Sequence, residues 1–152
     1  MIMDERTEFA DATALNTGVA GSYLIGDVYD TGGDGLNDVE CLYLVIQVAT
    51  SATSGGLATG QFHLCSDAQA AIAVNGSATY HWSSPAIPVA SLTAGTYIAK
   101  VELPKGQYER YVGIVQTTGT AAFTAGAINA FLTPNVNTYK SFAQAAGANI
   151  SQ

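Results

Sequence analysis

The sequence has few charged residues and few of the residues that favour long helices. Asp, Glu, Lys and Arg together make up 11% of its 152 residues, whereas 48% are hydrophobic and 16 are glycine. Glycine is unfavourable inside helices, and a long amphipathic helix needs charged or polar residues along its solvent face. This composition therefore favours one domain built from short strands that are joined by turns.

Long apolar runs are also missing. No stretch approaches the roughly 18 consecutive apolar residues that a membrane-spanning helix requires. The first residues, 1–5, lack the basic start and the apolar core of a secretion signal. We therefore expect no membrane partner and no export.

Cysteine and histidine are scarce, and their spacing does not suggest a metal site. The chain has two cysteines, Cys41 and Cys65, and two histidines, His63 and His81. They do not show the ligand spacing of zinc sites, and two cysteines do not build a disulfide framework in a chain of this size. We expect free, largely buried thiols, no metal and no cofactor.

Positive charge is scarce too, and the acidic residues are unevenly distributed. Residues 1–40 hold nine acidic side chains and one basic one, whereas residues 41–152 hold three acidic and four basic ones. A chain with a formal net charge of −7 should be repelled by phosphate backbones, so nucleic acid is not an expected partner. The acidic segment is either simply solvated or an arm that docks on a basic partner surface.

Alternating apolar residues and turn signals predict several strands. The clearest is 40–49, in which every second side chain is leucine, isoleucine or valine. The segments 97–103 and 105–115 predict a hairpin around the turn Pro104-Lys105-Gly106. The other predicted elements are strands at 22–30, 57–65, 77–83 and 123–133, and a helical turn at 67–72.

About eight short strands separated by turns predict an all-β fold, either a β-sandwich or a jelly roll. Residues 1–20 combine acidic residues, alanine and threonine with isolated apolar residues, which fits an extended N-terminal arm. The domain itself spans residues 21–134. Residues 135–152 follow a proline and form a tail or a short helix.

The predicted strand 105–115 is the only one with a tight cluster of charges. Glu102 and Glu109 flank a predicted turn and could be compared with the paired carboxylates of a glycosidase, but nearby basic residues make ion pairing the simpler explanation. Arg110 could pair with one of these two glutamates or contact another chain. The sequence has no motif of a serine hydrolase, a phosphate-binding loop or a zinc protease, so we expect no enzyme.

The segment 30–38 begins like a calcium-binding loop. Asp30 and Asp34 occupy positions one and five, and a glycine follows at position six. Position three is Gly32, however, and position twelve, where a bidentate glutamate would close the site, is Cys41. The pattern therefore predicts an ordinary acidic loop, with an ion site as the alternative.

Tyr80 and Trp82 lie two residues apart on a predicted strand, and they would therefore share one face. Such a pair can form an aromatic platform for a sugar ring. Aromatic pairs on strands are more often part of a core, because they bury a large apolar area. The sequence leaves both interpretations open.

Six segments carry a resemblance to a known family, in order along nearly the whole chain: 4–15, 42–48, 66–70, 85–89, 108–114 and 128–134. The segment 108–114, for example, reads Tyr-Glu-Arg-Tyr-Val-Gly-Ile. Together these segments resemble the small cement, or decoration, proteins of tailed-phage capsids, in particular the type found in a short-tailed Bordetella phage. The chain departs from this type mainly in the loop 30–38 and after residue 147.

The resemblance implies a jelly-roll subunit that forms homo-oligomers, either dimers or trimers, and binds the outer surface of a shell made of the major capsid protein. We then expect it in the host cytoplasm during assembly and on the virion afterwards. The residues expected at capsid or subunit interfaces are Ile2, Phe9, Leu15, Tyr108, Arg110 and Tyr111.

Two other functions remain open at this point. One is a carbohydrate-binding or adhesion β-sandwich, which would use Tyr80 and Trp82. The other is a structural component of the tail or of head completion, which would differ from a cement protein only in its place on the virion.

Overall fold

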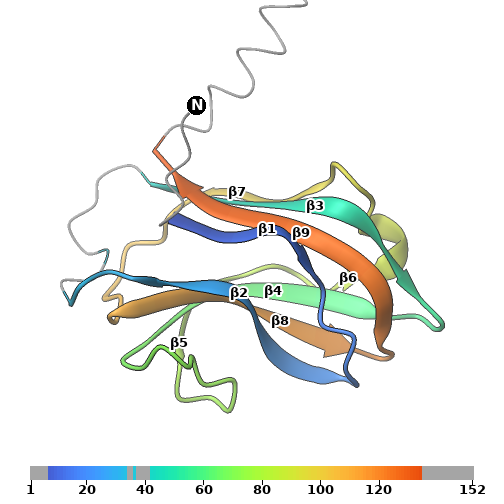
Figure 1. The fold of residues 1–152 in the computed structure, drawn as a ribbon, viewed down its shortest axis with the longest axis horizontal. Coiled ribbons are helices and arrows are strands. Elements are labelled where there is room, and N and C mark those ends of the chain that lie inside the picture. The colour runs from blue at the N-terminus through green and yellow to red at the C-terminus, as the bar shows by residue number, and fades with distance from the viewer. Residues whose placement is uncertain (1–6, 34–35, 37–41, 135–152) are drawn as a thin grey trace, which may run out of the picture.

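The described residues build two antiparallel β-sheets that lie face to face (Figure 1). In the computed structural model these residues are 7–33, 36 and 42–134. Sheet one contains, in spatial order, β1 (Glu8–Ala14), β9 (Phe123–Thr133), β3 (Tyr43–Ser54) and β7 (Tyr97–Glu102). Sheet two contains β2 (Gly21–Asp30), β8 (Tyr111–Gly119), β4 (Thr59–Asp67) and β5 (Thr79–Ser83), and the short β6 (Ile87–Pro88) also pairs with β4.

The chain passes repeatedly from one sheet to the other, and this gives the strand order of a jelly roll. The orders β1-β9-β3-β7 and β2-β8-β4-β5 place most consecutive strands in opposite sheets. The prediction of an all-β jelly-roll sandwich is confirmed. Between β6 and β7 lies a short 3-10 turn, η2 (Val89–Ser91). Within the described ranges, no helix has the length and apolar character needed to cross a membrane.

The main core lies between the two sheets. Leu44, Ile46 and Val48 of β3 are at most 1% exposed, on the side that the alternation of the sequence predicts. The same cluster contains Phe62 and Leu64 from β4 in the opposite sheet. Burial of each such side chain contributes on the order of 1.5–3 kcal/mol relative to exposure, so this cluster is a main source of stability.

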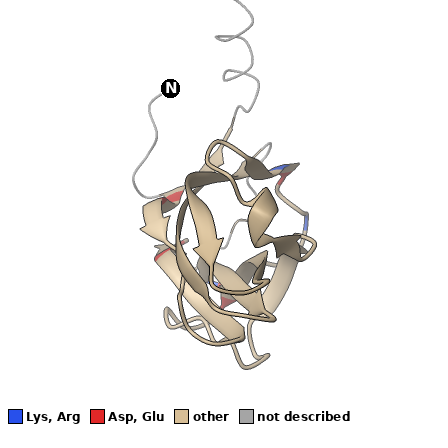
Figure 2. Cartoon of the chain, turned by 90° about the vertical axis from the view of Figure 1, so that its right-hand side faces the viewer, with Lys and Arg blue, Asp and Glu red and all other residues tan. Residues whose placement is uncertain are grey.

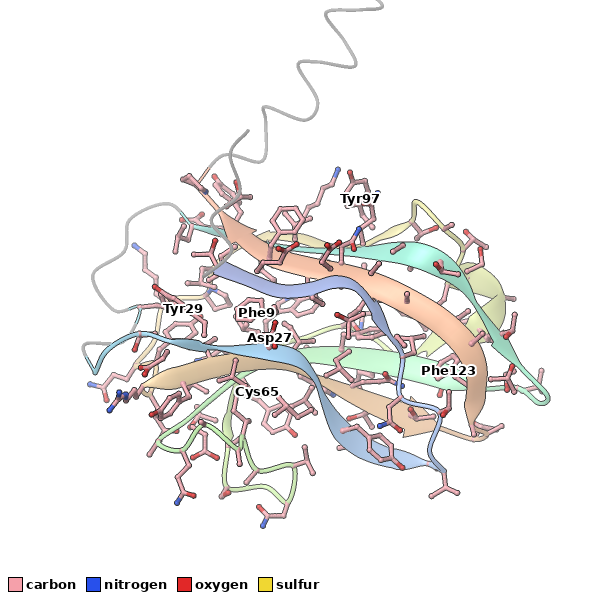
Figure 3. All side chains as sticks on the ribbon, in the orientation of Figure 1. Phe9, Asp27, Tyr29, Cys65, Tyr97 and Phe123 are labelled. Carbon is pink, nitrogen blue, oxygen red and sulfur yellow. The ribbon has the colours of Figure 1, made fainter. Side chains whose placement is uncertain are left out.

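A second and smaller cluster covers the outer face of sheet two. Cys65 and Val115 project from β4 and β8 on this side, and Ile72 and Ala78 from the β4–β5 connection pack against them. Figure 3 shows Cys65 on the side of the sheet that this connection covers. A large part of this outer face is therefore occupied by the chain itself.

The β4–β5 connection contains bends rather than the predicted helical turn at 67–72, so that prediction is wrong. The carboxylate of Asp67 accepts hydrogen bonds from the backbone N–H of Gln69 and of Ala73, at 3.2 and 3.0 Å. Side-chain bonds of this kind compete with helical bonds for the same donors.

The N-terminal segment is a strand where it is described, and not an extended arm. β1 pairs with β9, with Glu8 opposite Phe131 and Thr13 opposite Ile128. The arm predicted for 1–20 is therefore wrong for this part, and residues 1–6 lie outside the described residues. Two register shifts interrupt β1, and Ala12 has a φ of 44°. Such irregularities break the two-residue alternation by which a strand is recognised.

The predicted hairpin between 97–103 and 105–115 is also wrong. β7 pairs with β3 in sheet one, whereas β8 pairs with β2 and β4 in sheet two. Residues 103–110 cross between the sheets, and β8 begins only at Tyr111. β8 needs a central place because both of its faces are apolar: Val112 and Ile114 enter the main core, and Val115 enters the second cluster.

The connections gather at two ends of the sandwich that differ in charge. The pairs Gly21–Thr118, Thr59–Gly119 and Ser54–Phe123 bring the connections 15–20, 55–58, 84–96 and 120–122 to the same end. These four connections contain no Asp, Glu, Lys or Arg, and we call this the uncharged end. Figure 2 looks onto it, and the loops nearest the viewer carry neither charge colour. The charged end contains residues 103–110 and the end of β2.

Candidate functional site

Arg110 is held by Asp30 in a two-pronged ion pair at the charged end. Its Nε and Nη2 atoms donate to the two carboxylate oxygens of Asp30 at 2.8 and 2.9 Å. The backbone N–H and the hydroxyl of Thr31 both donate to the carbonyl oxygen of Arg110. Neither of the two partners suggested by the sequence, Glu102 or Glu109, forms this pair. Arg110 thus joins the end of β2 to the start of β8.

The Asp30–Arg110 pair shifts the ionisation of both groups. Hydrogen bonds from Arg110, and then from the backbone N–H of Gly32, lower the pKa of Asp30 to about 2. The pKa of Arg110 is raised, mainly by its hydrogen bond to Asp30. Both side chains remain about half exposed, so water screens the attraction. The first carboxylate of the calcium-like pattern is therefore already paired, while Asp34 and Cys41 lie outside the described residues.

Tyr108 is a core residue, so its predicted role at an interface is wrong. Its side chain is 5% exposed, and its hydroxyl donates to the carbonyl oxygen of Pro104 at 2.7 Å. Its ring stacks on His81 with 3.8 Å between centroids, and burial raises the pKa of Tyr108 to about 12. Tyr111, the first residue of β8, is half-buried, and the guanidinium of Arg110 lies 5.1 Å from its ring centroid. Its interface role stays a prediction.

His81 and Ser66 hold the crossing segment 103–110 against sheet two. Ser66 Oγ lies 2.7 Å from His81 Nε2 and accepts the backbone N–H of Glu109 at 3.1 Å. Because that oxygen accepts from Glu109, its own hydrogen is free to be donated to His81. Burial lowers the pKa of His81 and so favours the neutral imidazole that accepts this bond.

Tyr80 and Trp82 do not form a shared platform. The pairing of β5 with β4 shifts between Leu64–Trp82 and Cys65–Tyr80, which makes a bulge around His81. Trp82 packs against the main core, while Tyr80 lies opposite Cys65 on the outer side and meets His63 edge to face, 5.0 Å between centroids. The bulge therefore removes the geometry that a sugar platform at this pair requires.

His63 lies in a row of hydroxyl groups that crosses sheet two. Its Nδ1 atom is 2.6 Å from Ser83 Oγ and its Nε2 atom is 3.1 Å from Thr117 Oγ1, which is 2.8 Å from Ser22 Oγ. A serine beside a histidine is the first element of a nucleophile and base pair. Here both ring nitrogens contact hydroxyl groups, and no carboxylate of the described residues orients the ring. Burial lowers the pKa of His63.

The described residues contain no group of three or more His, Cys, Asp and Glu side chains that could hold a metal ion. The cysteine among them, Cys65, is buried, and this burial raises the pKa of its thiol to about 12. A thiol with such a pKa is neither a good nucleophile nor a good metal ligand at neutral pH.

Two of the three N-terminal residues expected at a capsid or subunit interface, Phe9 and Leu15, lie in the main core. Phe9 is 1% exposed and Leu15 is 4% exposed, and both belong to the main core. Figure 3 shows Phe9 between the two sheets. Their predicted contact with a capsid is therefore wrong, because they are covered by their own domain. Ile2 lies outside the described residues.

Comparison with protein-family models assigns the chain to a family. The family model Bbp16 matches residues 9–132, which span the jelly roll from β1 almost to the end of β9. The chain belongs to the Bbp16 family. This family is associated with bacteriophage. A search of curated proteins finds no match.

Two surfaces of this Bbp16-family domain are left for contacts with other molecules. The first is the outer face of sheet one, where Tyr97 is 40% exposed and Lys100 Nζ lies 3.2 Å from the centroid of its ring. Figure 3 shows Tyr97 pointing away from the sandwich. Phe131 and Val45 lie opposite each other in the middle of this face and are only 7% and 2% exposed, so its open part is the margin at β7 around Tyr97 and Lys100.

The second surface is the uncharged end, where two large apolar side chains are almost fully exposed. Val19 is 77% exposed in the β1–β2 connection, and Leu57 is 80% exposed in the β3–β4 connection. The sequence-based prediction missed both. A usable signal was present, because each residue is flanked by glycine in a turn-forming segment and no charge lies nearby in the sequence.

Proposed function

We propose that the chain is a structural virion protein that binds the outer surface of a phage capsid and stabilises it. The observation that carries this proposal is the Bbp16 match over the whole jelly roll, together with the resemblance of six segments to phage cement proteins. In this proposal the protein stabilises the shell because its contacts with capsid subunits bury additional surface area, and not because it catalyses a reaction.

The proposed partners are the major capsid protein of the same phage and further copies of this chain, in dimers or trimers. The formal net charge of −7 supports a place outside the shell, because packaged nucleic acid would repel an acidic protein on the inside. Assembly would take place in the host cytoplasm. A closed shell offers many equivalent sites, and a symmetric oligomer could engage more than one of them.

A component of the tail or of head completion remains the second candidate, since the family match applies to it equally. A carbohydrate-binding module has less support, because the bulge in β5 places Tyr80 and Trp82 on different sides of the sheet. The number of copies on the virion separates the two phage functions, since a cement protein occupies the whole shell and a tail or completion component does not.

The test uses DNA-filled heads of the phage that encodes the chain, prepared without this protein. We expect the purified protein to sediment with these heads, to saturate at many copies per head, and to raise the temperature at which they release DNA. An image of virions with the protein labelled should show label over the whole shell. Label confined to the tail or to one vertex, or no sedimentation with heads, would contradict the cement function.

A further inference from the structure

One end of the sandwich contains no charged residue among the residues that the structure describes. Residues 12–26, 42–66, 68–99 and 111–134 contain no Asp, Glu, Lys or Arg. In the jelly roll, the middle parts of these segments form the uncharged end (Figure 2). Asp30, Lys105, Glu109 and Arg110 lie at the opposite end. A partner that approaches the uncharged end removes no formal charge from water, and such removal is the most costly part of forming a dry interface.

Val19 and Leu57 lie at the same end of sheet two although they are far apart in the sequence. The strand order β2-β8-β4 places Gly21 on one side of Thr118 and Gly60 on its other side. Neighbouring strands are about 4.8 Å apart, so the two connections leave the sheet roughly 10 Å from each other. The two exposed apolar side chains therefore belong to one surface.

The connection that carries Val19 is fixed by hydrogen bonds to buried and half-buried groups. Gln116, which is fully buried, accepts the backbone N–H of Asn16 at 2.9 Å and donates to its carbonyl oxygen at 3.2 Å. The hydroxyl of Tyr23 donates to the carbonyl oxygen of Val19 at 2.7 Å. Val19 is thus held in an exposed position, and little conformational freedom is lost when a partner covers it.

The connection that carries Leu57 is fixed in a similar way. Ser54 Oγ accepts the backbone N–H of Gly56 at 3.1 Å and donates to the carbonyl oxygen of Ala122 at 2.7 Å. These bonds tie the β3–β4 connection to the β8–β9 connection beside it. An isolated exposed leucine on a surface is ordinary. Two large apolar side chains at the same end of the sandwich, on fixed and uncharged connections, are a preorganised contact surface.

The dimensions of this end indicate what kind of partner it fits. Four strands at 4.8 Å and two sheets about 10 Å apart, with their side chains, give an end face of roughly 400 Å². A stable interface between two proteins buries about 800 Å² on each. The uncharged end alone is therefore too small to hold two free copies together, but it suffices as one of many repeated contacts on a closed shell.

We propose that the uncharged end is the surface that meets the capsid, and that Val19 and Leu57 insert against an uncharged, apolar surface of the capsid protein. This inference rests on the proposed cement function. It sets the orientation of the protein: the charged end, with Asp30, Lys105, Glu109 and Arg110, points away from the shell into solvent. The exposed margin of sheet one around Tyr97 is then left for neighbouring copies.

The test compares three aspartate variants that place the same charge on different surfaces. Leu57→Asp and Val19→Asp change the uncharged end, whereas Val74→Asp changes an apolar residue of 40% exposure on the β4–β5 connection. All three positions are exposed, so the variants should melt close to the parent protein. The measurements are affinity for heads that lack the protein, by sedimentation, and oligomeric mass in solution, by light scattering.

We expect Leu57→Asp and Val19→Asp each to weaken binding to heads by about tenfold or more, and Val74→Asp to bind like the parent. The oligomeric mass of all three should equal that of the parent. Parent-like binding by Leu57→Asp and Val19→Asp overturns the inference but leaves the cement function intact. A loss of oligomeric mass in these two variants shows that copies of the chain meet at this end, which also overturns it. If the parent itself does not bind heads, both proposals fail together.

Discussion

The main-chain oxygen of Phe9 occupies the space that a side chain at Gly26 would fill. Gly26 has a φ of +73°, in the left-handed region that glycine tolerates best. It lies on β2, at the shift in register between Ile25 and Tyr29, and Phe9 lies on β1 in the other sheet. The missing side chain therefore lets the two edge strands approach and close one side of the sandwich.

We expect Gly26→Ala to reduce the free energy of unfolding by about 3 kcal/mol or more, because the new Cβ meets backbone that cannot move aside easily. Denaturant unfolding measures this. Gly95→Ala is the matched control: its φ is +86°, and no atom lies within 4 Å of the added Cβ. The control should show only the backbone penalty, about 1–2 kcal/mol. Equal losses in the two variants would mean that the contact with Phe9 contributes nothing.

The Asp30–Arg110 pair predicts a specific dependence on pH. The pKa of Asp30 is about 2 in the folded protein against an ordinary value of 3.8, so the pair stabilises the fold above about pH 4. That contribution is lost as the pH falls toward 2. Arg110→Gln should raise the pKa of Asp30 toward its ordinary value, as measured by carboxyl NMR titration, although the hydrogen bond from Gly32 remains. The difference in melting temperature between parent and variant should be small, since both groups are half exposed, and should vanish only below pH 2.

Lys105→Gln is the control for this titration, because it removes a positive charge from the same crossing segment but leaves the guanidinium of Arg110 in place. It should leave the pKa of Asp30 near 2. If Lys105→Gln changes the pKa of Asp30 as much as Arg110→Gln does, the pKa is set by nearby positive charge in general and not by the two hydrogen bonds from Arg110.

Gln116→Leu should destabilise the fold by about 1–3 kcal/mol, because it removes the buried partner of the Asn16 N–H. Hydrogen exchange at Asn16 should become faster, which separates loosening of this connection from a general loss of stability. Gln47→Leu serves as the control, since the amide of Gln47 makes one exposed bond to Gly95 at 3.3 Å. Its effect should stay within about 0.5 kcal/mol. Unchanged exchange at Asn16 in Gln116→Leu would argue against this role of the buried amide.

Cys65 should resist alkylation in the folded protein. In a Cys41→Ser background, where Cys65 is the remaining cysteine, the raised pKa of about 12 leaves a thiolate fraction on the order of a thousandfold below that of a free thiol at pH 8. Iodoacetamide labelling, followed by mass spectrometry, should be complete only in denaturant. Rapid labelling of the native protein would show that the β4–β5 connection does not cover this face.

The strands that sequence patterns predicted well are those whose burial follows simple alternation. In β3, Leu44, Ile46 and Val48 repeat every second residue, and all three are buried as expected. β9 begins and ends at the predicted residues, 123 and 133. Such strands need no information about their neighbours, because one face is apolar along its whole length.

The errors concern residues whose surroundings come from distant parts of the chain. Arg110 lies 80 residues from Asp30 in sequence, so the local charges suggested the wrong partner. His81, at the bulge in β5, stacks on Tyr108 from another connection, and this bulge separates Tyr80 from Trp82. Local patterns cannot reveal such contacts, because they depend on which distant strands pair and on how the connections pack against them.

The exposed pair at the uncharged end could not be predicted as a pair for the same reason. Val19 and Leu57 come together only through the order β2-β8-β4, which pattern reasoning did not give. The long segments without charge are visible in the sequence, but their composition does not show which of them lie at the same end of the fold. Charge-free loops at one end of a sandwich become recognisable only when the topology is known.

The pairing of β1 with β9 has a practical consequence. Because Glu8 lies opposite Phe131, the chain enters and leaves the jelly roll at adjacent points, at the end away from Val19 and Leu57. In the proposed orientation these points face outward from the particle. A reporter or an antigen joined directly before β1 or after β9 would then be displayed in many copies on the side of the particle away from the shell.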